Sequence, residues 1–199
     1  MVRITASRHK SLALALVVTA AASLSGCHKH DQATAVQKAE ATKAATAVGT
    51  SHNVLDALGG AANLGAFTKL AKSAGLEKTF GGVGDYTLFA PTDAALAKLS
   101  DTQRKLLESP DGRPQLLAML RQHIATGYIT QADLEKALAR DGGAVSLASM
   151  GGSPVRLHRQ GSAIFLGHGE AGPKIAASPI VARNGVIYPI DQVIAPAKR

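Results

Sequence analysis

The cysteine, histidine and acidic side chains near the amino terminus are the first that could do chemistry. Cys27 is the only cysteine of the chain, so it cannot form an intramolecular disulfide. His28, His30 and Asp31 follow it within four positions and together could be a metal patch. Two imidazoles on a segment without a predicted core lack the fixed geometry that selects a metal, so we predict no metal site there.

A later set of polar side chains could in principle converge on one site: His158, His168 and Glu170. Their placement in a loop and on a strand surface favours ordinary surface residues, because a catalytic site needs a cleft with mutually oriented groups. The chain has no Gly-x-Ser-x-Gly nucleophile elbow and no paired metal-binding histidine motif. We therefore predict no catalytic residue, no metal and no cofactor, and a protein that is not an enzyme.

The glycines at positions 81, 82 and 84 raise the question of a phosphate-binding loop. A nucleotide fingerprint places its glycines after a strand and at the start of a helix, where backbone amides face the phosphate. Here the glycines precede a predicted strand over 86–90, and we exclude a nucleotide site.

Composition and charge limit the class of partner. A length of 199 residues suits one domain, and 46% hydrophobic against 18% charged residues is ordinary globular composition. Four Phe, three Tyr and no Trp offer little surface for stacking on sugars or bases. The formal charge is +8 and falls to +5 without Arg3, Arg8 and Lys10 of the predicted leader. This balance favours anionic partners in general and gives no reason to expect nucleic acid.

Residues 1–26 have the layout of a signal peptide. Basic residues precede an uncharged apolar run over 11–24, which is too short to span a bilayer of about 30 Å. The segment Leu24-Ser25-Gly26-Cys27 is similar to the bacterial lipoprotein processing box. This resemblance implies cleavage before Cys27 and lipidation of its sulfur and amine. Two or more acyl chains anchor stably, so we expect the membrane as a partner through this lipid.

Residues 27–51 are predicted to be the lipidated cysteine and a flexible tether. Residues 28–51 are rich in Ala, Thr, Lys and Gln and lack the apolar periodicity of a core element. A flexible chain of that length has an end-to-end distance of about 25–30 Å, enough to hold a domain clear of a membrane. His28 directly after Cys27, in place of an acidic residue, is similar to lipoproteins sorted to an outer membrane. We expect the outer membrane rather than the inner one.

Helical signals dominate the first half of residues 52–199, the predicted single domain. Asn53 is a candidate N-cap, and Gly75 suits the end of a helix over 64–74. Thr92 or Asp93 can cap a short helix through 99, and residues 100–103 form a capping box for a helix that ends near 110. Further helices are expected over 111–127, with His123 half buried at the edge of the apolar face, and over 130–138.

Strand signals follow the helices. The apolar pattern changes to period two from Gly142 onward, which predicts strands around 145–147, 155–157 and 164–166. Asn184-Gly185 is a turn before a last strand over 186–194, in which Pro189 demands an edge position or a bulge. Helices first and strands later indicate an α+β domain.

Four blocks in order over residues 52–196 resemble fasciclin-type domains. The first signature block runs from Tyr86 to Leu96, and Leu70 to Leu76 resembles the family's preceding helix. His123-Ile124 and the segment from Asn184 to Pro196 resemble the later blocks. The resemblance implies a β-sandwich or wedge of two small sheets with several helices packed against it. It also implies a role in adhesion or extracellular binding without catalysis.

The polar residues of these blocks are expected to specify the fold. Asp93 is well placed to cap a helix, and Asp191 is expected to be half buried and hydrogen-bonded because Ile190 and Val193 flank it. We therefore interpret one set of residues as fold-specifying, and not as an acid–base pair: Pro91, Thr92, Asp93, His123, Asn184, Gly185 and Asp191.

Two positions depart from the family's pattern. Gln122 stands where members commonly place a tyrosine before the helix histidine, so a Tyr–His adhesive pair is absent. Ser178-Pro179-Ile180 stands where members have Asp-Ile before the Asn-Gly turn. Integrin-type recognition through that aspartate loses its carboxylate, and the resemblance does not carry animal-style adhesion over to this chain.

The resulting functional prediction is a lipid-anchored module of the cell envelope that binds proteins or surface polysaccharide. Four basic residues could meet anionic polysaccharide or lipopolysaccharide, although each type is commonly a solvated surface residue: Arg156, Arg159, Lys174 and Arg183. The alternative prediction is a carrier of a small hydrophobic ligand, because some fasciclin-type proteins resemble pigment or lipid binders with an apolar cleft. The partner, the side that the domain faces and the oligomeric state are left open by the sequence.

Overall fold

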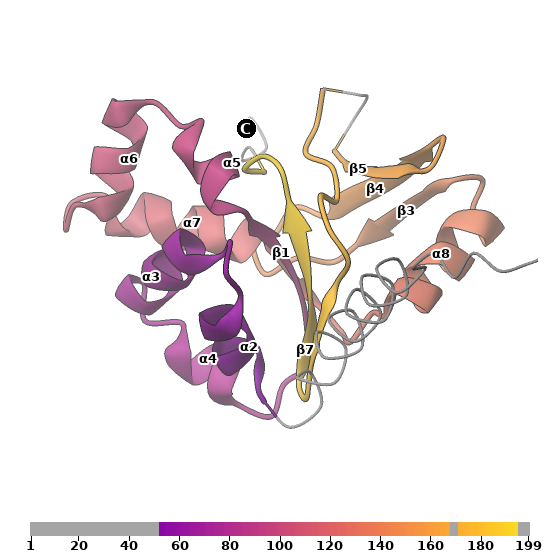
Figure 1. The fold of residues 1–199 in the computed structure, drawn as a ribbon, viewed down its shortest axis with the longest axis horizontal. Coiled ribbons are helices and arrows are strands. Elements are labelled where there is room, and N and C mark those ends of the chain that lie inside the picture. Colours follow the sequence, from indigo (N-terminus) through magenta and orange to yellow (C-terminus); the bar gives the residue numbers. More distant parts are fainter. Residues whose placement is uncertain (1–51, 168–170, 195–199) are drawn as a thin grey trace, which may run out of the picture. The chain divides into compact units, whose positions relative to one another are not determined.

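The computed structural model describes residues 52–167 and 171–194, which belong to one unit of the chain. The predicted leader over 1–26 and the tether over 27–51, with Cys27, lie outside the described residues, as do His168 and Glu170. Within the described ranges, no helix is both long and apolar enough to cross a membrane. Within these ranges helices predominate up to residue 122 and strands after it, with one strand over 86–91 and one helix over 131–140 as exceptions (Figure 1).

In the part of the chain that the structure describes, six helices form one layer, and local signals fix several of their ends. Asn53 accepts a hydrogen bond from Asp56 N at 3.0 Å and caps the first helix. Ser100 and Gln103 form a reciprocal capping box, and Gly75 has a φ of 78° just after the second helix. The helices are α2 (Val54–Gly60), α3 (Gly65–Ser73), α4 (Glu77–Gly81), α5 (Asp93–Ala97), α6 (Asp101–Glu108) and α7 (Arg113–Gln122).

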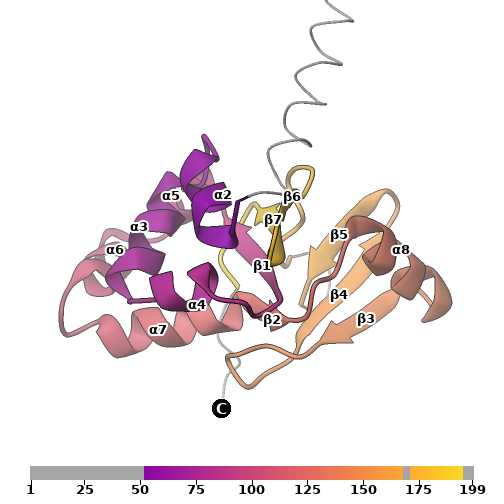
Figure 2. The ribbon, with the colours of Figure 1, turned by 90° about the horizontal axis from the view of Figure 1, so that it is seen from below.

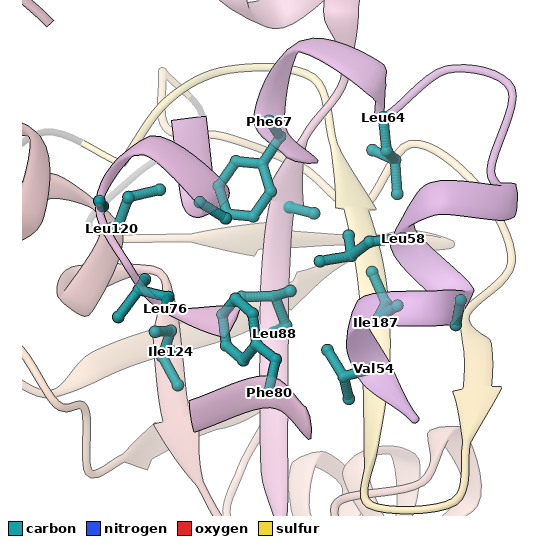
Figure 3. Packing of buried hydrophobic residues seen from close by; sticks show 14 of the residues in the cluster. Val54, Leu58, Leu64, Phe67, Leu76, Phe80, Leu88, Leu120, Ile124 and Ile187 are labelled. Carbon is teal, nitrogen blue, oxygen red and sulfur yellow. The ribbon is translucent and has the colours of Figure 1, made fainter. Parts of the chain in front are cut away.

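These helices cover one face of a four-stranded sheet. Its strands lie in the order β2-β1-β7-β6, with β1 parallel to β7 and the outer pairs antiparallel. Leu88 and Ile187 point from the sheet into an apolar cluster with Leu58, Phe67 and Phe80 of the helices (Figure 3). The strands are β1 (Tyr86–Pro91), β2 (Ile124–Thr126), β6 (Ile180–Ala182) and β7 (Gly185–Ile190).

A second, three-stranded sheet and one helix pack on the other face of the first sheet (Figure 2). Its order is β3-β4-β5, all antiparallel, with β3 (Ala144–Leu147), β4 (Val155–Gln160) and β5 (Ala163–Leu166). Helix α8 (Gln131–Arg140) contributes Leu134 and Leu138 to this second cluster. Tyr188 stacks on Phe89 at 5.6 Å between ring centroids and donates to Ile129 O at 3.0 Å. The prediction of an α+β fold with two small sheets is confirmed.

Several elements differ from the sequence-based expectation: strand β6 was not predicted, and the last strand, expected over 186–194, ends at Ile190. The helix predicted over 111–127 ends at Gln122, because residues from Ile124 to Thr126 leave it and pair antiparallel with β1 as β2. Short α4 was not predicted, and it includes Gly81, one of the glycines assigned to a loop. A strand of three residues has no period long enough to distinguish it from the helix before it.

Pro189 lies in β7, an interior strand of the first sheet, but its own position is a local edge, as the sequence predicts. Strand β7 has β1 on one side and β6 on the other. Strand β6 spans only Ile180–Ala182, opposite Gly185–Ile187, and has ended before the level of Pro189. The carbonyl of Pro189 accepts from Ala176 N at 2.8 Å. On the β6 side Pro189 thus faces the segment around Ala176 and not a strand, so its missing N–H removes no bond of the β6–β7 ladder.

Candidate functional site

The Pro91-Thr92-Asp93 turn connects the first sheet to two helices. Thr92 Oγ1 accepts from Ala95 N at 3.1 Å and so caps its own helix, α5. Asp93 caps a different helix, because its Oδ1 accepts from Ala66 N of α3 at 2.8 Å. Of the two residues predicted as caps for the helix after 92, Thr92 has that role and Asp93 joins α5 to α3.

His123 follows α7 and is completely buried, so the expectation of a half-buried edge position is wrong. Its Nε2 accepts from Ile194 N at 3.0 Å, which assigns the proton to Nδ1, 2.8 Å from Met119 O. The ring of Phe67 lies beside it, with centroids 6.2 Å apart. Burial lowers the pKa of His123 from 6.5 to about 4, against the opposing effect of the Met119 carbonyl.

Asn184 is buried and makes three hydrogen bonds to backbone groups far away in the sequence. Its Oδ1 accepts from Val54 N at 2.8 Å, at the start of α2. Its Nδ2 donates to Phe80 O at 2.8 Å and to Gly82 O at 2.9 Å, at the end of α4. A Cβ on the next residue, Gly185, would overlap the Tyr86 carbonyl and the Val54 side chain. This turn therefore also holds two helix ends against the sheet.

Asp191 follows β7 and connects it to the segment after β5. Its side chain is 26% exposed, and Oδ1 accepts from Lys174 N at 2.8 Å. The Lys174 ammonium lies 4.0 Å from Oδ2, and Lys98 Nζ donates to the Asp191 carbonyl at 3.0 Å. The carboxylate is occupied by the backbone and a lysine, which suits a structural role better than proton transfer.

Four of the residues interpreted as fold-specifying each connect distant backbone segments, and we call them the signature side chains. Asp93, His123, Asn184 and Asp191 each accept a hydrogen bond from a backbone N–H that is 17 to 130 residues away. No cluster of three or more His, Cys, Asp or Glu that could hold a metal occurs within 52–167 and 171–194. His158 stacks on Phe165 with centroids 5.6 Å apart. The two residues predicted to converge with it lie outside the described ranges.

The four basic residues of the predicted patch do not share one surface. Arg156 and Arg159 are three positions apart on β4, so their side chains leave opposite faces of the strand. Lys174 lies beside Asp191, and Arg183 lies in the β6–β7 turn, where its N–H donates to His52 O. Lys174 lies opposite Phe165, which is itself opposite His158, so Lys174 is on the same outer face of the second sheet as Arg156. The expected patch is therefore divided, with Arg159 and Arg183 away from these two residues.

Two surface hollows could accept a ligand, and neither was predicted from the sequence. The larger, about 630 Å³, lies between α3, α5 and α6, and we call it the helical groove. The smaller, about 270 Å³, lies on the outer face of the second sheet around Arg156 and His158, and we call it the sheet hollow. Each hollow forms where residues of separate elements become neighbours. The periodicity of residues within one helix or strand does not predict such neighbours.

A family model described as the fasciclin domain matches residues 62–196, more than half of the chain. The chain belongs to the fasciclin domain family. Helix α2 precedes the matched range and packs in the same apolar cluster as the helices within it. In this fasciclin domain, the signature side chains are Asp93, His123, Asn184 and Asp191.

Three relatives are similar in sequence to parts of this chain. Protein sll1483 of Synechocystis is 28% identical over 63% of this chain and 63% of its own length. Protein sll1735 of the same organism is 35% identical over 56% of this chain and 73% of its own. Pig transforming growth factor-beta-induced protein ig-h3 is 28% identical over 72% of this chain but only 19% of its own. The chain thus spans only part of the length of these relatives.

The structural comparison agrees with the family assignment at the level of the fold. A FAS1 domain pair from the insect cell adhesion molecule fasciclin I matches with a TM-score of 0.56 and 19% identity. The match covers 74% of this chain and 52% of the insect chain. This match shows that the two chains share a fold.

The two departures from the family pattern have different structural settings. Gln122 is buried at the end of α7, where its Nε2 donates to Ser153 O at 2.9 Å. It connects the helical layer to the loop before β4, so this position faces protein and not solvent. Ser178 is exposed in the segment before β6.

Proposed function

We propose that this chain is a non-enzymatic binding module of the bacterial cell envelope, which acts in adhesion to proteins or surface polysaccharides. The observation that carries the proposal is the use of the signature side chains. Asp93, His123, Asn184 and Asp191 are all hydrogen-bonded to distant backbone groups. The polar residues by which the family is recognised therefore stabilise the fold. We infer that a partner binds to other residues, which lie on the surface of the domain.

The test of this function is attachment of beads that carry the purified protein. Beads are offered the organism's own cells, isolated envelope, matrix proteins and surface polysaccharides across a salt series. Saturable attachment to one of these surfaces is expected, and a decrease with rising salt identifies an ionic contact. Absence of attachment to every surface, by protein that remains folded, refutes adhesion.

We further propose that a lipid on Cys27 anchors the protein, with the outer membrane as its location. The apolar run over 11–24 and the Leu-Ser-Gly-Cys segment support this assignment. Labelled palmitate is expected to enter the wild-type protein, and Cys27→Ser is expected to abolish labelling and release the protein from membranes. Membrane-bound Cys27→Ser protein would contradict the anchor. Separation of inner and outer membranes on a density gradient tests the sorting.

A second candidate function, a carrier of a small hydrophobic ligand, is favoured by the helical groove. Its volume of about 630 Å³ is within the range of roughly 300–1,000 Å³ for ligand pockets. Helix α6 lines it but buries none of its own residues, and Leu106 is 43% exposed. Four charged residues also line the groove, and its apolar lining consists of Ala66, Leu70, Leu96, Ala97, Leu99 and Leu107.

Neighbouring leucines of α6 provide a matched test of the carrier function. Leu107 lines the groove, whereas Leu106 lies outside it. Organic extracts of purified protein are analysed by mass spectrometry for Leu107→Arg, Leu106→Arg and wild type. A carrier releases a hydrophobic molecule from wild type and Leu106→Arg but not from Leu107→Arg. Extracts without any such molecule, or equal extracts from all three proteins, refute it.

A further inference from the structure

The outer face of the second sheet is an exposed surface with a definite set of side chains. Along β3, and along β4 from Val155 to Leu157, exposed residues alternate with buried or half-buried ones, so this part of the sheet presents one face to solvent. Arg156 lies opposite Ser146 across the β3–β4 ladder, and His158 lies opposite Ala144. Opposed residues of an antiparallel pair point to the same side. These four side chains therefore share the outer face.

Small neighbours open the sheet hollow between the two large side chains of β4. Ala144 and Ser146 flank it on the β3 side, and Gly167 follows β5 on the other side. The N–H of Gly167 donates to the Arg156 carbonyl at 2.8 Å, which fixes this glycine beside the arginine. The result is a floor of small residues between a guanidinium and an imidazole.

The His158 ring at the side of the hollow packs against a second aromatic ring. Phe165 lies opposite His158 on β5, and the two rings stack with an interplanar angle of 22°. One face of His158 is therefore covered by Phe165, while its other side is next to the small residue Ala144. A ring held in this way presents a flat surface and a nitrogen to a ligand without losing further side-chain freedom on binding.

The charge of Arg156 is available for a ligand. Within the described ranges no carboxylate lies within 4.0 Å of its guanidinium, whereas Arg104 and Arg140 are paired with Asp101 and Asp141. Between residues 142 and 190 the sequence has four Lys or Arg and a single acidic residue, Glu170. An unpaired guanidinium in such surroundings favours an oxyanion, which it can bind through two parallel N–H donors.

We propose that the sheet hollow binds one oxyanion-bearing sugar residue of an acidic polysaccharide. In this arrangement Arg156 binds the carboxylate or sulfate, and Ser146 and His158 bind ring hydroxyls. The volume of about 270 Å³ is below that of drug-sized ligand pockets, so one unit of a polymer enters while the chain continues along the open face. This inference rests on the proposed binding function and names its partner class.

Four purified full-length proteins test the hollow: wild type, Arg156→Gln, Arg159→Gln and Ser146→Leu. The probes are alginate as a carboxylated polymer, dextran sulfate as a sulfated one, and neutral dextran. Arg159→Gln is the matched control, because it removes the same charge from the same strand on the opposite face. Ser146→Leu fills the hollow at an exposed position and leaves the charge unchanged. Thermal unfolding verifies that each variant is folded.

Arg156→Gln and Ser146→Leu are each expected to weaken binding of at least one acidic polymer about tenfold or more, since each removes a contact or the space for it. Arg159→Gln is expected to change affinity less than about twofold, and neutral dextran is not expected to bind. The two acidic polymers distinguish a carboxylate from a sulfate as the bound group. Two results would overturn the proposed site and indicate diffuse charge attraction instead. One is an equal loss of affinity for Arg156→Gln and Arg159→Gln, and the other is an unchanged affinity for Ser146→Leu.

Two further probes separate the failure of this site from the failure of the proposed function. If isolated envelope binds wild type and Arg156→Gln equally, the sheet hollow is not the binding site, but the proposed binding function is retained. If no surface binds wild type, the function itself fails. Vesicles of anionic phospholipid and duplex DNA are also offered. Binding to either that depends on Arg156 as strongly as polymer binding would overturn the assignment to polysaccharide.

Discussion

Protonation of His123 is expected to make this domain sensitive to mild acid. The imidazole is completely buried, and its Nε2 accepts from Ile194 N, so the folded state requires the neutral form. Burial lowers its pKa from 6.5 to about 4. An unfolded chain takes up the proton below about pH 6.5, whereas the folded chain takes it up only near pH 4. The stabilisation is therefore complete above pH 6.5 and is lost as the pH falls towards 4.

The size of this effect follows from the two pKa values. They differ by about 2.5, and each unit corresponds to about 1.36 kcal/mol, so the free energy of unfolding falls by about 3 kcal/mol over this range. A domain of this size has a total stability of roughly 5–15 kcal/mol, so one residue accounts for a large share. The structural consequence is specific, because a protonated Nε2 would place a second N–H against that of Ile194.

The assay is urea unfolding at intervals from pH 7.5 to 4, with His123→Gln as the comparison. The glutamine oxygen can accept from Ile194 N at every pH, but the variant loses the Nδ1 donor to Met119 O. We expect the variant to be about 1–2 kcal/mol less stable at pH 7.5. Between pH 6.5 and 4 this deficit should disappear and then reverse, so that the variant is about 1–2 kcal/mol more stable than wild type near pH 4, because wild type alone loses about 3 kcal/mol. The other six histidines are present in both proteins and cancel in the difference. A difference between the two proteins that stays constant with pH would refute this reasoning.

Three substitutions test the other backbone contacts, each by urea unfolding at pH 7.5. Asn184→Ala leaves the buried Val54 N–H and two carbonyls without partners, and should lower the free energy of unfolding by about 3 kcal/mol; a loss below 1 kcal/mol would contradict the three contacts. Gly185→Ala should lose about 2 kcal/mol or more because its Cβ meets the Tyr86 carbonyl, and an unchanged stability would show that the strand shifts freely. Asp93→Ala should lose about 1 kcal/mol as a removed helix cap, with Asp93→Asn retaining most of it; equal losses for both would deny the cap.

The elements that the sequence predicts well are those that end on local chemistry. Asn53, Gly75 and the Ser100–Gln103 capping box act within one turn of the residues they terminate, so their meaning does not depend on tertiary structure. The paired strands of the second sheet were also predictable, since one face is buried and the alternation of side chains reports it. Strand β2 was missed because it inherits the apolar pattern of α7.

The contacts of the signature residues depend on distances along the chain that no local pattern encodes. Asp93 looks like a cap for its own helix, and only the packing of α5 against α3 brings it to Ala66 instead. Asn184 looks like an ordinary turn residue, yet it is the common partner of α2 and α4. Pro189 is tolerated inside the sheet because β6 is short, which is a property of its neighbour. Family resemblance identified these positions, but the physical reason for each comes from the fold.

The domain divides structural and surface roles between its two halves. The backbone contacts of Asp93 and Asn184 lie among the helices and the first sheet, where substitution is expected to unfold the protein. The outer face of the second sheet has exposed side chains whose removal exposes no core, so changes there should alter binding alone. This separation allows Arg156 and Arg159 to be compared on one strand at constant fold. A surface that varies without affecting stability is where members of one fold can differ in what they bind.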